Sequence, residues 1–276
     1  MGWMLWFLMI PMGIVLIYSL VMKGIYGGIV WQMTFENYER AFDWLYLKIF
    51  LQSLKLALLT AISCLLIGYP MAYVIATANQ KYRSALLILL IIPFWTNFVV
   101  RTYALKVLFS EQGPLNAAAM ALGFFSEPIS FSNSYGMVWI GMVTNYLPYM
   151  VLPLYVSIEK FDFSLLEAGR DLGASSWNNF WKVLVPLTKP GIITGFILVF
   201  TPALGEFLIP DLLGGARSML MGNLITEQFL KMRDWPFGSA LSIILMSIVL
   251  ISLVIVIRVW MKEEQTKVEA EAAHGH

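Results

Sequence analysis

The chain has 276 residues, of which 59% are hydrophobic and only 13% are charged, whereas an ordinary soluble domain carries about 25% charged residues. A soluble fold of this size needs more polar groups for its surface, so we predict a polytopic membrane protein. The net charge of +1 gives no sign of a nucleic-acid partner. One cysteine, Cys64, and two histidines near the end, His274 and His276, leave no basis for a disulfide framework, a metal site or an internal histidine base.

Six long windows of the sequence contain no Asp, Glu, Lys or Arg. A spanning helix needs about 20 predominantly apolar residues, and lipid offers an unpaired backbone no partner. The windows therefore predict an all-α membrane protein with six transmembrane helices. The expected spans cover about residues 1–22, 50–78, 84–108, 135–158, 190–212 and 236–259, and the transmembrane domain covers 1–260.

The two ends of the chain carry separate expectations. The first window has no basic leader region and no clear cleavage site, so it is interpreted as a retained span rather than a signal peptide. It begins abruptly at Met1, which fits either a short leader or a native start further upstream. Residues 261–276 are charged and small and are predicted to form a flexible tail.

The loops between the spans do not orient the chain in the membrane. Six spans put both termini on one side, and the 18 Lys and Arg residues divide evenly between the two sides. The positive-inside rule therefore gives no answer.

The connection between the fourth and fifth spans, residues 159–189, reads as two short amphipathic helices joined by an elbow. Ser164 and Glu167 have the spacing of a capping box, and Gly173 suits the left-handed position that ends a helix. Ser175 or Ser176 can cap a second helix, Trp177 to Val185, which Pro186 stops. Such an elbow is suited to docking onto a partner. An ordinary amphipathic connecting loop is the alternative.

The same elbow carries a motif. Glu167-Ala168-Gly169-Arg170-Asp171-Leu172-Gly173, followed by Val183-Leu184-Val185-Pro186, resembles the EAA loop of ABC importer permeases. The chain departs from the usual pattern at Gly169, Val183 and Val185. The resemblance implies a MetI-like permease bundle whose elbow is cytoplasmic, with both termini on the same side. It assigns coupling to an ATPase to six residues: Glu167, Ala168, Gly169, Asp171, Gly173 and Pro186.

Three further motifs narrow the resemblance. They are similar to motifs of spermidine/putrescine permeases, and most of all to those of the first of the two permease subunits. The motifs are Pro93-Phe94-Trp95-Thr96-Asn97 with Arg101-Thr102-Tyr103, the run Leu208 to Gly215, and Arg233-Asp234-Trp235-Pro236. The resemblance runs from about Phe35 to Trp260. Importers of other organic cations, opines or metal ions share parts of this pattern and remain alternatives for the substrate.

The resemblance also implies partners and a location. We expect an ATP-binding subunit dimer, a second homologous permease and a periplasmic or extracellular polyamine-binding protein, all at a bacterial inner membrane. The sequence contains no Gly-x-x-x-x-Gly-Lys phosphate loop, so the chain is not expected to be an enzyme. It is expected to bind no cofactor, while the partner ATPase uses ATP and Mg.

A polyamine needs carboxylates for its ammonium groups and aromatic faces for its methylene stem. Glu206 lies roughly 22 Å along a fifth span that begins near Gly191, and Asp211 follows near the outer interface. An acid at such depth is costly unless it faces water or a partner. Both are therefore hypothetical stations, meaning sites where the cation pauses. The alternative is a structural ion pair of Glu206 with Arg101 or Arg217.

The polar and aromatic residues of the third span, Trp95, Asn97 and Tyr103, are the other candidates for the substrate pathway. Aromatic residues of the membrane interface are the alternative interpretation. Arg217, Lys231, Arg233 and Asp234 between the last two spans are either docking charges or solvated ones.

Two other classes compete with the importer subunit. An autonomous secondary transporter predicts inverted repeats, which the two halves do not show. A membrane-embedded enzyme predicts a cluster of His, Asp or Cys, and the chain has no internal histidine.

Overall fold

The computed structural model describes residues 2–24, 27–123, 127, 133–215 and 218–274. Helices dominate this part of the chain, as the sequence predicts. The chain divides into two compact units, Met1–Lys48 with Leu224–His276, and Ile49–Asn223.

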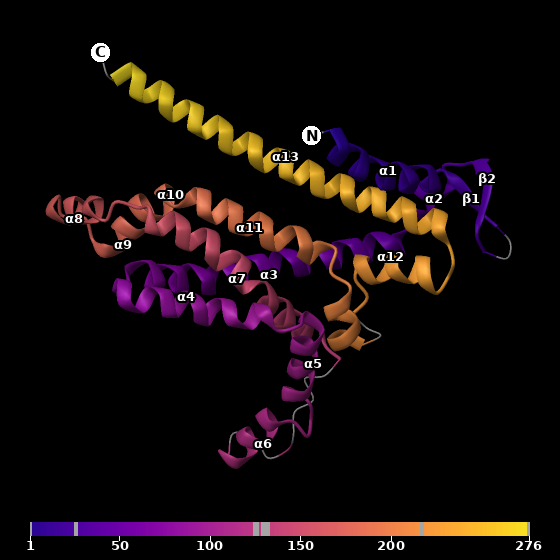
Figure 1. Ribbon diagram of the computed structural model, residues 1–276, viewed down its shortest axis with the longest axis horizontal. Helices are drawn as coiled ribbons and strands as arrows, with labels where there is room; N and C mark the ends of the chain where they lie inside the picture. Colours follow the sequence, from indigo (N-terminus) through magenta and orange to yellow (C-terminus); the bar gives the residue numbers. More distant parts are fainter. Residues whose placement is uncertain (1, 25–26, 124–126, 128–132, 216–217, 275–276) are drawn as a thin grey trace. The chain divides into compact units, whose positions relative to one another are not determined.

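The first unit is built on two apolar helices that lie side by side, α1 (Gly2–Ser19) and α13 (Trp235–His274) (Figure 1). Between α1 and the next span the chain forms a small antiparallel hairpin, which the all-α expectation did not include. Its strands are β1 (Val21–Lys23) and β2 (Ile29–Met33), and helix α2 (Glu36–Ala41) follows. Both β1 and α2 contact α13.

A buried carboxylate joins these elements. Asp234 is 2% exposed, and its Oδ2 lies 2.9 Å from Arg40 Nη1 and 3.4 Å from Lys23 Nζ. Its Oδ1 accepts a hydrogen bond from the Phe237 amide and so caps α13. Burial alone lowers the pKa of the Arg40 guanidinium, but hydrogen bonds to Tyr46 and Asp234 outweigh it and raise the pKa. Arg40 therefore stays charged throughout the physiological range.

The second unit contains most of the remaining helices. They are α3 (Trp44–Thr77, which begins in the first unit), α4 (Gln80–Trp95), α5 (Phe98–Leu108), α6 (Pro114–Ala121), α7 (Tyr135–Glu159), α8 (Ser164–Asp171), α9 (Ser176–Asn179), the π-helix η1 (Phe180–Leu184), α10 (Val185–Leu187), α11 (Lys189–Leu204), the π-helix η2 (Pro210–Gly214) and α12 (Met221–Leu230, which ends in the first unit).

The core of this unit is the pair α7 and α11, which run side by side (Figure 1). Two glycines of α11 allow the close approach. A Cβ at Gly191 would lie 2.5 Å from the Ser157 Cβ, and one at Gly195 would lie 2.7 Å from the Met150 sulfur. Small residues at such crossings let backbones meet where no hydrophobic effect drives association.

Among the described residues, three helices are long and apolar enough to cross a membrane: α3, α7 and the Trp235–Val254 part of α13. Two bent pairs raise the number to five if each pair is one span, and Met9–Ser19 adds a shorter apolar helix. The chain is thus a helical membrane protein, while six spans remain a prediction.

Three predicted elements differ from the structure. The expected span 84–108 bends by 93° between α4 and α5, because Pro93 and the cap at Asn97 end one helix and start another. The expected span 190–212 ends at Leu204, since Gly205 and the cap at Glu206 interrupt it. The expected tail 261–276 continues α13 as a helix to His274, because Lys, Glu, Gln and Ala are strong helix formers.

The contact of Asp234 predicts a measurable order of stabilities. Asp234→Ala removes the ion pairs and the cap and should lower the free energy of unfolding by about 2 kcal/mol, discounted for the half-exposed partners. Asp234→Asn keeps a capping oxygen and should cost about half as much. Thermal unfolding of the detergent-purified chain measures both. Glu227→Gln, which removes the exposed ion pair with Lys231, is the control. Equal melting of Asp234→Ala and wild type would contradict the assignment.

Candidate functional site

The elbow begins with a capped helix. The Asp162 carboxylate accepts a hydrogen bond from the Ser164 amide at 3.0 Å, and the hydroxyl and amide of Ser164 lower the pKa of Asp162. Helix α8 then runs from Ser164, preceded by Phe163 without a side-chain cap. The predicted capping box of Ser164 and Glu167 is therefore wrong. The carboxylate two residues earlier forms the turn, because a short acidic side chain readily bonds a backbone amide two residues on.

The end of α8 matches the expectation for Gly173. Gly173 has φ +83°, its amide donates to Arg170, and the amide of Ala174 donates to the Gly169 carbonyl. This pair of bonds is the Schellman pattern that closes a helix on a left-handed residue. Glycine adopts this conformation without strain, so it fixes the direction in which the chain leaves α8.

The second helix of the elbow also has its cap. The Ser175 hydroxyl accepts a hydrogen bond from the Asn178 amide, so Ser175 is the cap of the two residues predicted, Ser175 and Ser176. The helix does not stop at Val185, because it passes through the π-helix η1 and continues past Pro186 to Leu187. The wider turn changes the hydrogen-bonding register immediately before a residue without an N–H, so the proline is accommodated rather than helix-breaking.

Gly169, the departure from the usual motif, has a specific neighbour. The Asn179 side chain is 4% exposed and donates from Nδ2 to the Leu166 carbonyl at 2.9 Å. A Cβ at Gly169 would overlap this amide. Asn179 thus ties α8 to α9 through the space that a missing Cβ leaves open.

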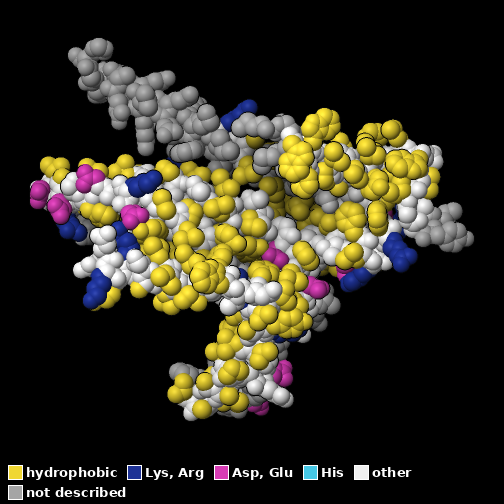
Figure 2. Space-filling model, in the orientation of Figure 1, with side chains coloured by type: hydrophobic (Ala, Val, Ile, Leu, Met, Phe, Trp, Pro, Cys, Tyr) yellow, Lys and Arg dark blue, Asp and Glu magenta, His cyan; other side chains and the backbone are white. Residues whose placement is uncertain are grey.

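The outer face of the elbow is exposed and mixed in character. Its large apolar side chains are open to solvent, most of all Leu172 at 90% and Trp177 at 69%. Glu167 and Asp171 are exposed beside them. Figure 2 shows charged side chains gathered at the end of the second unit that carries α8 and α9, and mainly apolar ones over its middle. This face has the composition of a docking surface.

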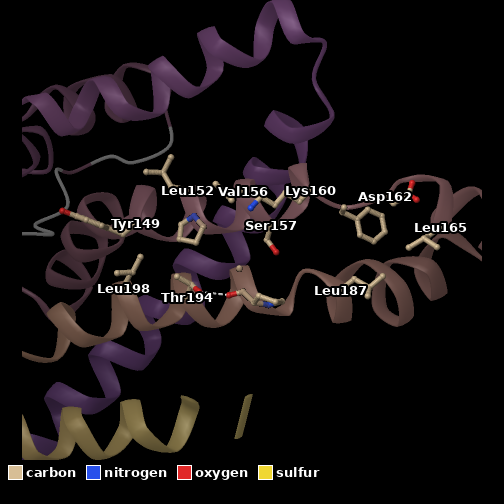
Figure 3. A pocket seen from close by; sticks show the side chains of 14 residues that line it. Tyr149, Leu152, Val156, Ser157, Lys160, Asp162, Leu165, Leu187, Thr194 and Leu198 are labelled. Atoms are coloured by element: carbon tan, nitrogen blue, oxygen red, sulfur yellow. Dashed lines mark hydrogen bonds between the residues drawn. The ribbon is translucent and has the colours of Figure 1, made fainter. Parts of the chain in front are cut away.

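A cavity of about 780 Å³ lies where the elbow meets the helices. Figure 3 shows Tyr149 and Leu198 at one end of it and Asp162 and Leu165 at the other. Its lining comes from α7, α8, α10 and α11 and from residues 160–162, which connect α7 to α8. Any displacement of α8 relative to α7 and α11 therefore changes the shape of this cavity.

The third-span motif forms the corner between α4 and α5. The Pro93 carbonyl accepts from the Thr96 amide and hydroxyl and from Arg101 Nη1. The Asn97 side chain accepts from the Val99 and Val100 amides and starts α5. The motif residues Pro93, Thr96, Asn97 and Arg101 all take part in these bonds, so much of the motif serves to form the turn between α4 and α5.

The candidate residues of this corner occupy different settings. Trp95 is 87% exposed and Tyr103 is 50% exposed, so both rings are open, whereas the Asn97 side chain is engaged as a cap. Arg101 Nε donates at 2.6 Å to Asn145, a buried residue of α7. Arg101 is directed at the Asn145 amide and the Pro93 carbonyl rather than at Glu206.

Glu206 caps the segment that follows α11. Its Oε1 accepts from the amides of residues 207–209 at 3.1, 2.9 and 3.3 Å, and its Oε2 accepts from the Tyr146 hydroxyl. The side chain is 8% exposed. These donors offset the cost of burying the carboxylate. Asp211 is exposed in the first turn of η2, and η2 packs against α5, which carries Tyr103. The other ion-pair candidate, Arg217, lies outside the described residues.

One further break separates α10 from α11. The two helices lie on either side of Thr188, and the helical segments around it are bent by 67°. The Thr188 hydroxyl lies 2.8 Å from the Tyr69 hydroxyl of α3, and its carbonyl accepts from Ser157 of α7 at 3.4 Å. Helix α7 therefore supplies a partner at all three breaks: Asn145, Tyr146 and Ser157.

The sequence prediction missed Asn145, Asn179 and the specific pairing of Tyr146. Asn145 stands in an apolar window, where a buried amide needs a partner, and that signal was available. Asn179 and Tyr146 had no comparable signal, because their partners are distant in the sequence.

Comparison with known proteins gives the family. Residues 65–263 match the model of the binding-protein-dependent transport system inner membrane component. The permease protein PotB of the spermidine/putrescine transport system is 46% identical over 244 residues, both in Escherichia coli (strain K12), covering 88% of this chain and 89% of the relative, and in Salmonella typhimurium (strain SL1344), covering 88% and 85%. The inner membrane ABC transporter permease protein YdcU of Escherichia coli (strain K12) is 27% identical, covering 92% and 85%.

Solved structures agree on the fold. A bacterial ABC transporter that imports the acidic polysaccharide alginate matches with a TM-score of 0.70 at 16% identity, covering 94% of this chain and 93% of that one. The same kind of transporter in complex with its pentasaccharide-bound periplasmic protein matches with a TM-score of 0.69 at 17% identity, covering 92% and 90%. The chain belongs to the family of binding-protein-dependent transport system inner membrane components.

Proposed function

We propose that the chain is a permease subunit of an ATP-driven spermidine/putrescine importer. The observation that carries this proposal is the 46% identity to PotB proteins over 88% of the chain. The carboxylates Glu206 and Asp211, near breaks in the helices, support a cationic substrate.

The elbow is the proposed contact with an ATP-binding subunit. Its exposed Leu172 and Trp177 and its acidic Glu167 offer a partner both apolar surface and charge. In this proposal the elbow and both termini are cytoplasmic, ATP and Mg are used by the partner, and a second permease completes the pathway. A polyamine-binding protein delivers cargo to the opposite side.

Glu206 is the proposed site where the cation pauses deeper in the span than Asp211. The carboxylate has about four lone-pair positions, and Tyr146 uses only one of those on Oε2. An ammonium group can therefore bind Oε2 beside the Tyr146 ring while the backbone bonds to Oε1 remain. At 8% exposure the site is closed here, so binding requires its neighbours to move.

The three breaks are the proposed places of that movement. Bending at residues 96–97, 188 and 205–207 changes a few side-chain contacts, whereas bending inside a continuous helix breaks backbone hydrogen bonds. In alternating access, α7 then serves as the fixed helix against which the broken spans turn.

Uptake by the reconstituted complex tests the substrate. The chain is assembled in liposomes with its ATP-binding subunit, its second permease and its binding protein, and radiolabelled putrescine and spermidine are supplied outside with ATP inside. ATP-dependent accumulation of either cation supports the proposal. Accumulation of molybdate or of an opine, with no polyamine uptake, contradicts it.

The two roles of Glu206 predict different mutant behaviour. Glu206→Gln keeps an acceptor for the backbone amides but loses the charge, so polyamine uptake should fall at least about tenfold while the complex still assembles, since a buried charge contact contributes about 1.5–3 kcal/mol. Tyr146→Phe leaves the carboxylate in place and should reduce uptake much less. Initial uptake rates normalised to purified complex measure both effects.

A different outcome would show that Glu206 does not bind the cation. If Glu206→Gln transports at the wild-type rate and Glu206→Ala does not assemble, Glu206 is a structural cap only. Glu111→Gln, which removes an exposed acid outside the proposed pathway, is the control.

The contact between Gly169 and Asn179 predicts a substitution of unexpected sign. Alanine is a better helix former than glycine by about 0.5–1 kcal/mol, so propensity alone predicts that Gly169→Ala stabilises the elbow. We expect the reverse, because the new Cβ displaces the buried Asn179 amide from the Leu166 carbonyl. Co-purification with the ATP-binding subunit and ATPase activity should both fall.

A second substitution tests the cause of this effect. Gly169→Ala combined with Asn179→Ala removes the overlap and should recover part of the association, whereas Asn179→Ala alone weakens it. Arg170→Gly, at an exposed position of the same helix outside the six proposed coupling residues, controls for helix propensity. Unchanged association in Gly169→Ala would contradict the role of this contact.

A further inference from the structure

Arg83 joins the ends of two helices at the base of the elbow. It lies in the first turn of α4, six residues after the end of α3. Its Nη1 donates to Glu159 Oε1 at 2.8 Å, and its Nη2 donates to the Ala76 carbonyl at 2.7 Å. One guanidinium therefore contacts the last residue of α7 and the last turn of α3.

Electrostatics explains why a cation stands at this point. The carboxyl ends of α3 and α7 each carry partial negative charge, and Glu159 adds a full one at the end of α7, where an acid is unfavourable. Arg83 sets one positive charge against these groups, and its planar fork holds two acceptors at once, the Glu159 carboxylate and the Ala76 carbonyl. Lysine has no such fork, so it would not hold both acceptors in the same way.

The contact sits next to the moving part of the proposed mechanism. Only residues 160–163 separate Glu159 from α8. Within this short segment Phe161 is buried and packs edge-on against Phe163, whose ring also faces Tyr73 of α3. The base of the elbow is thus linked to α3 at two points: through Arg83, which bridges Glu159 to the Ala76 carbonyl, and through the contact of Phe163 with Tyr73.

Because the ion pair is partly exposed, we expect it to affect the position of the helices more than the stability of the fold. The side chains of Arg83 and Glu159 are 28% and 38% exposed, so solvent screens their attraction and the pair adds little to folding. Its geometric effect is not screened, because the two short bonds fix where α7 ends relative to α3.

We propose that Arg83 is a positioning residue for coupling, which holds the base of the elbow on α3 so that displacement of α8 moves the spans. The inference rests on the proposed importer function. Without this contact, an elbow pushed by its partner would shift the end of α7 alone, and ATP would be hydrolysed with less transport.

The test compares variants in the complete reconstituted complex. Arg83→Gln and Glu159→Gln each remove the ion pair, and Lys81→Gln is the matched control, because Lys81 is a cation in the same turn with its side chain over Tyr82. The measured quantity is the ratio of solute imported to ATP hydrolysed. We expect this ratio to fall about fivefold in both variants, the lower range of measured couplings between sites, with no change in Lys81→Gln.

Exchanging the two charges sharpens the test. Arg83→Glu with Glu159→Arg restores an ion pair and puts a cation at the end of α7, but it sets a carboxylate against the Ala76 carbonyl. The exchange should recover the ratio in part, above that of Arg83→Glu alone. A ratio in Arg83→Gln equal to wild type, or a loss of assembled complex with an unchanged ratio, would overturn the proposal.

A second readout does not depend on the substrate. Cys64 is the only cysteine, so spin labels can be placed at Thr77→Cys and Lys160→Cys in a Cys64→Ala background. The distribution of distances between the labels should broaden in Arg83→Gln and stay narrow in Lys81→Gln. If polyamine uptake fails in the wild-type complex, the substrate proposal is wrong while this distance still tests Arg83. An unchanged distribution in Arg83→Gln contradicts the positioning role.

Discussion

A buried backbone group that leaves a helix must find another partner, and the rest of this fold depends on how the chain meets that requirement. The helices are interrupted near residues 96–97, 188 and 205–207. At each interruption a side chain replaces the missing helical bonds. Asn97 caps α5, Thr188 bonds back to the Leu184 carbonyl, and Glu206 caps the segment before η2.

Helix α7 connects these interruptions. It stays continuous from Tyr135 to Glu159 despite Pro148 and Pro153, and it contacts each break through one polar side chain. Asn145 accepts a hydrogen bond from Arg101, Tyr146 donates one to Glu206, and Ser157 donates one to the Thr188 carbonyl. Glu159, the last residue of α7, forms an ion pair with Arg83. These polar side chains of α7 therefore mark the points where broken segments are attached to one unbroken helix.

The sequence predicts the elements better than their ends and partners. Apolar windows locate α3, α7, α11 and α13, because helix formation in lipid depends on composition over about 20 residues. The Gly173 turn and the Ser175 cap follow from local chemistry and were predictable. The interruption at Glu206 was not, because a carboxylate that caps three amides is indistinguishable in sequence from one on a continuous helix. Asn179 fills the space at Gly169 from ten residues away, so the motif alone reads Gly169 as a small departure.

In the proposed cycle the three breaks move while α7 stays fixed, and hydrogen–deuterium exchange can measure this difference. The complete complex is compared without nucleotide and with ATP held unhydrolysed, peptide by peptide. Exchange should change at residues 96–98, 188–189 and 205–209, and the amides of α7 should stay protected in both states. Exchange that changes within α7 around Pro148 and Pro153, with the three breaks unaltered, would contradict it.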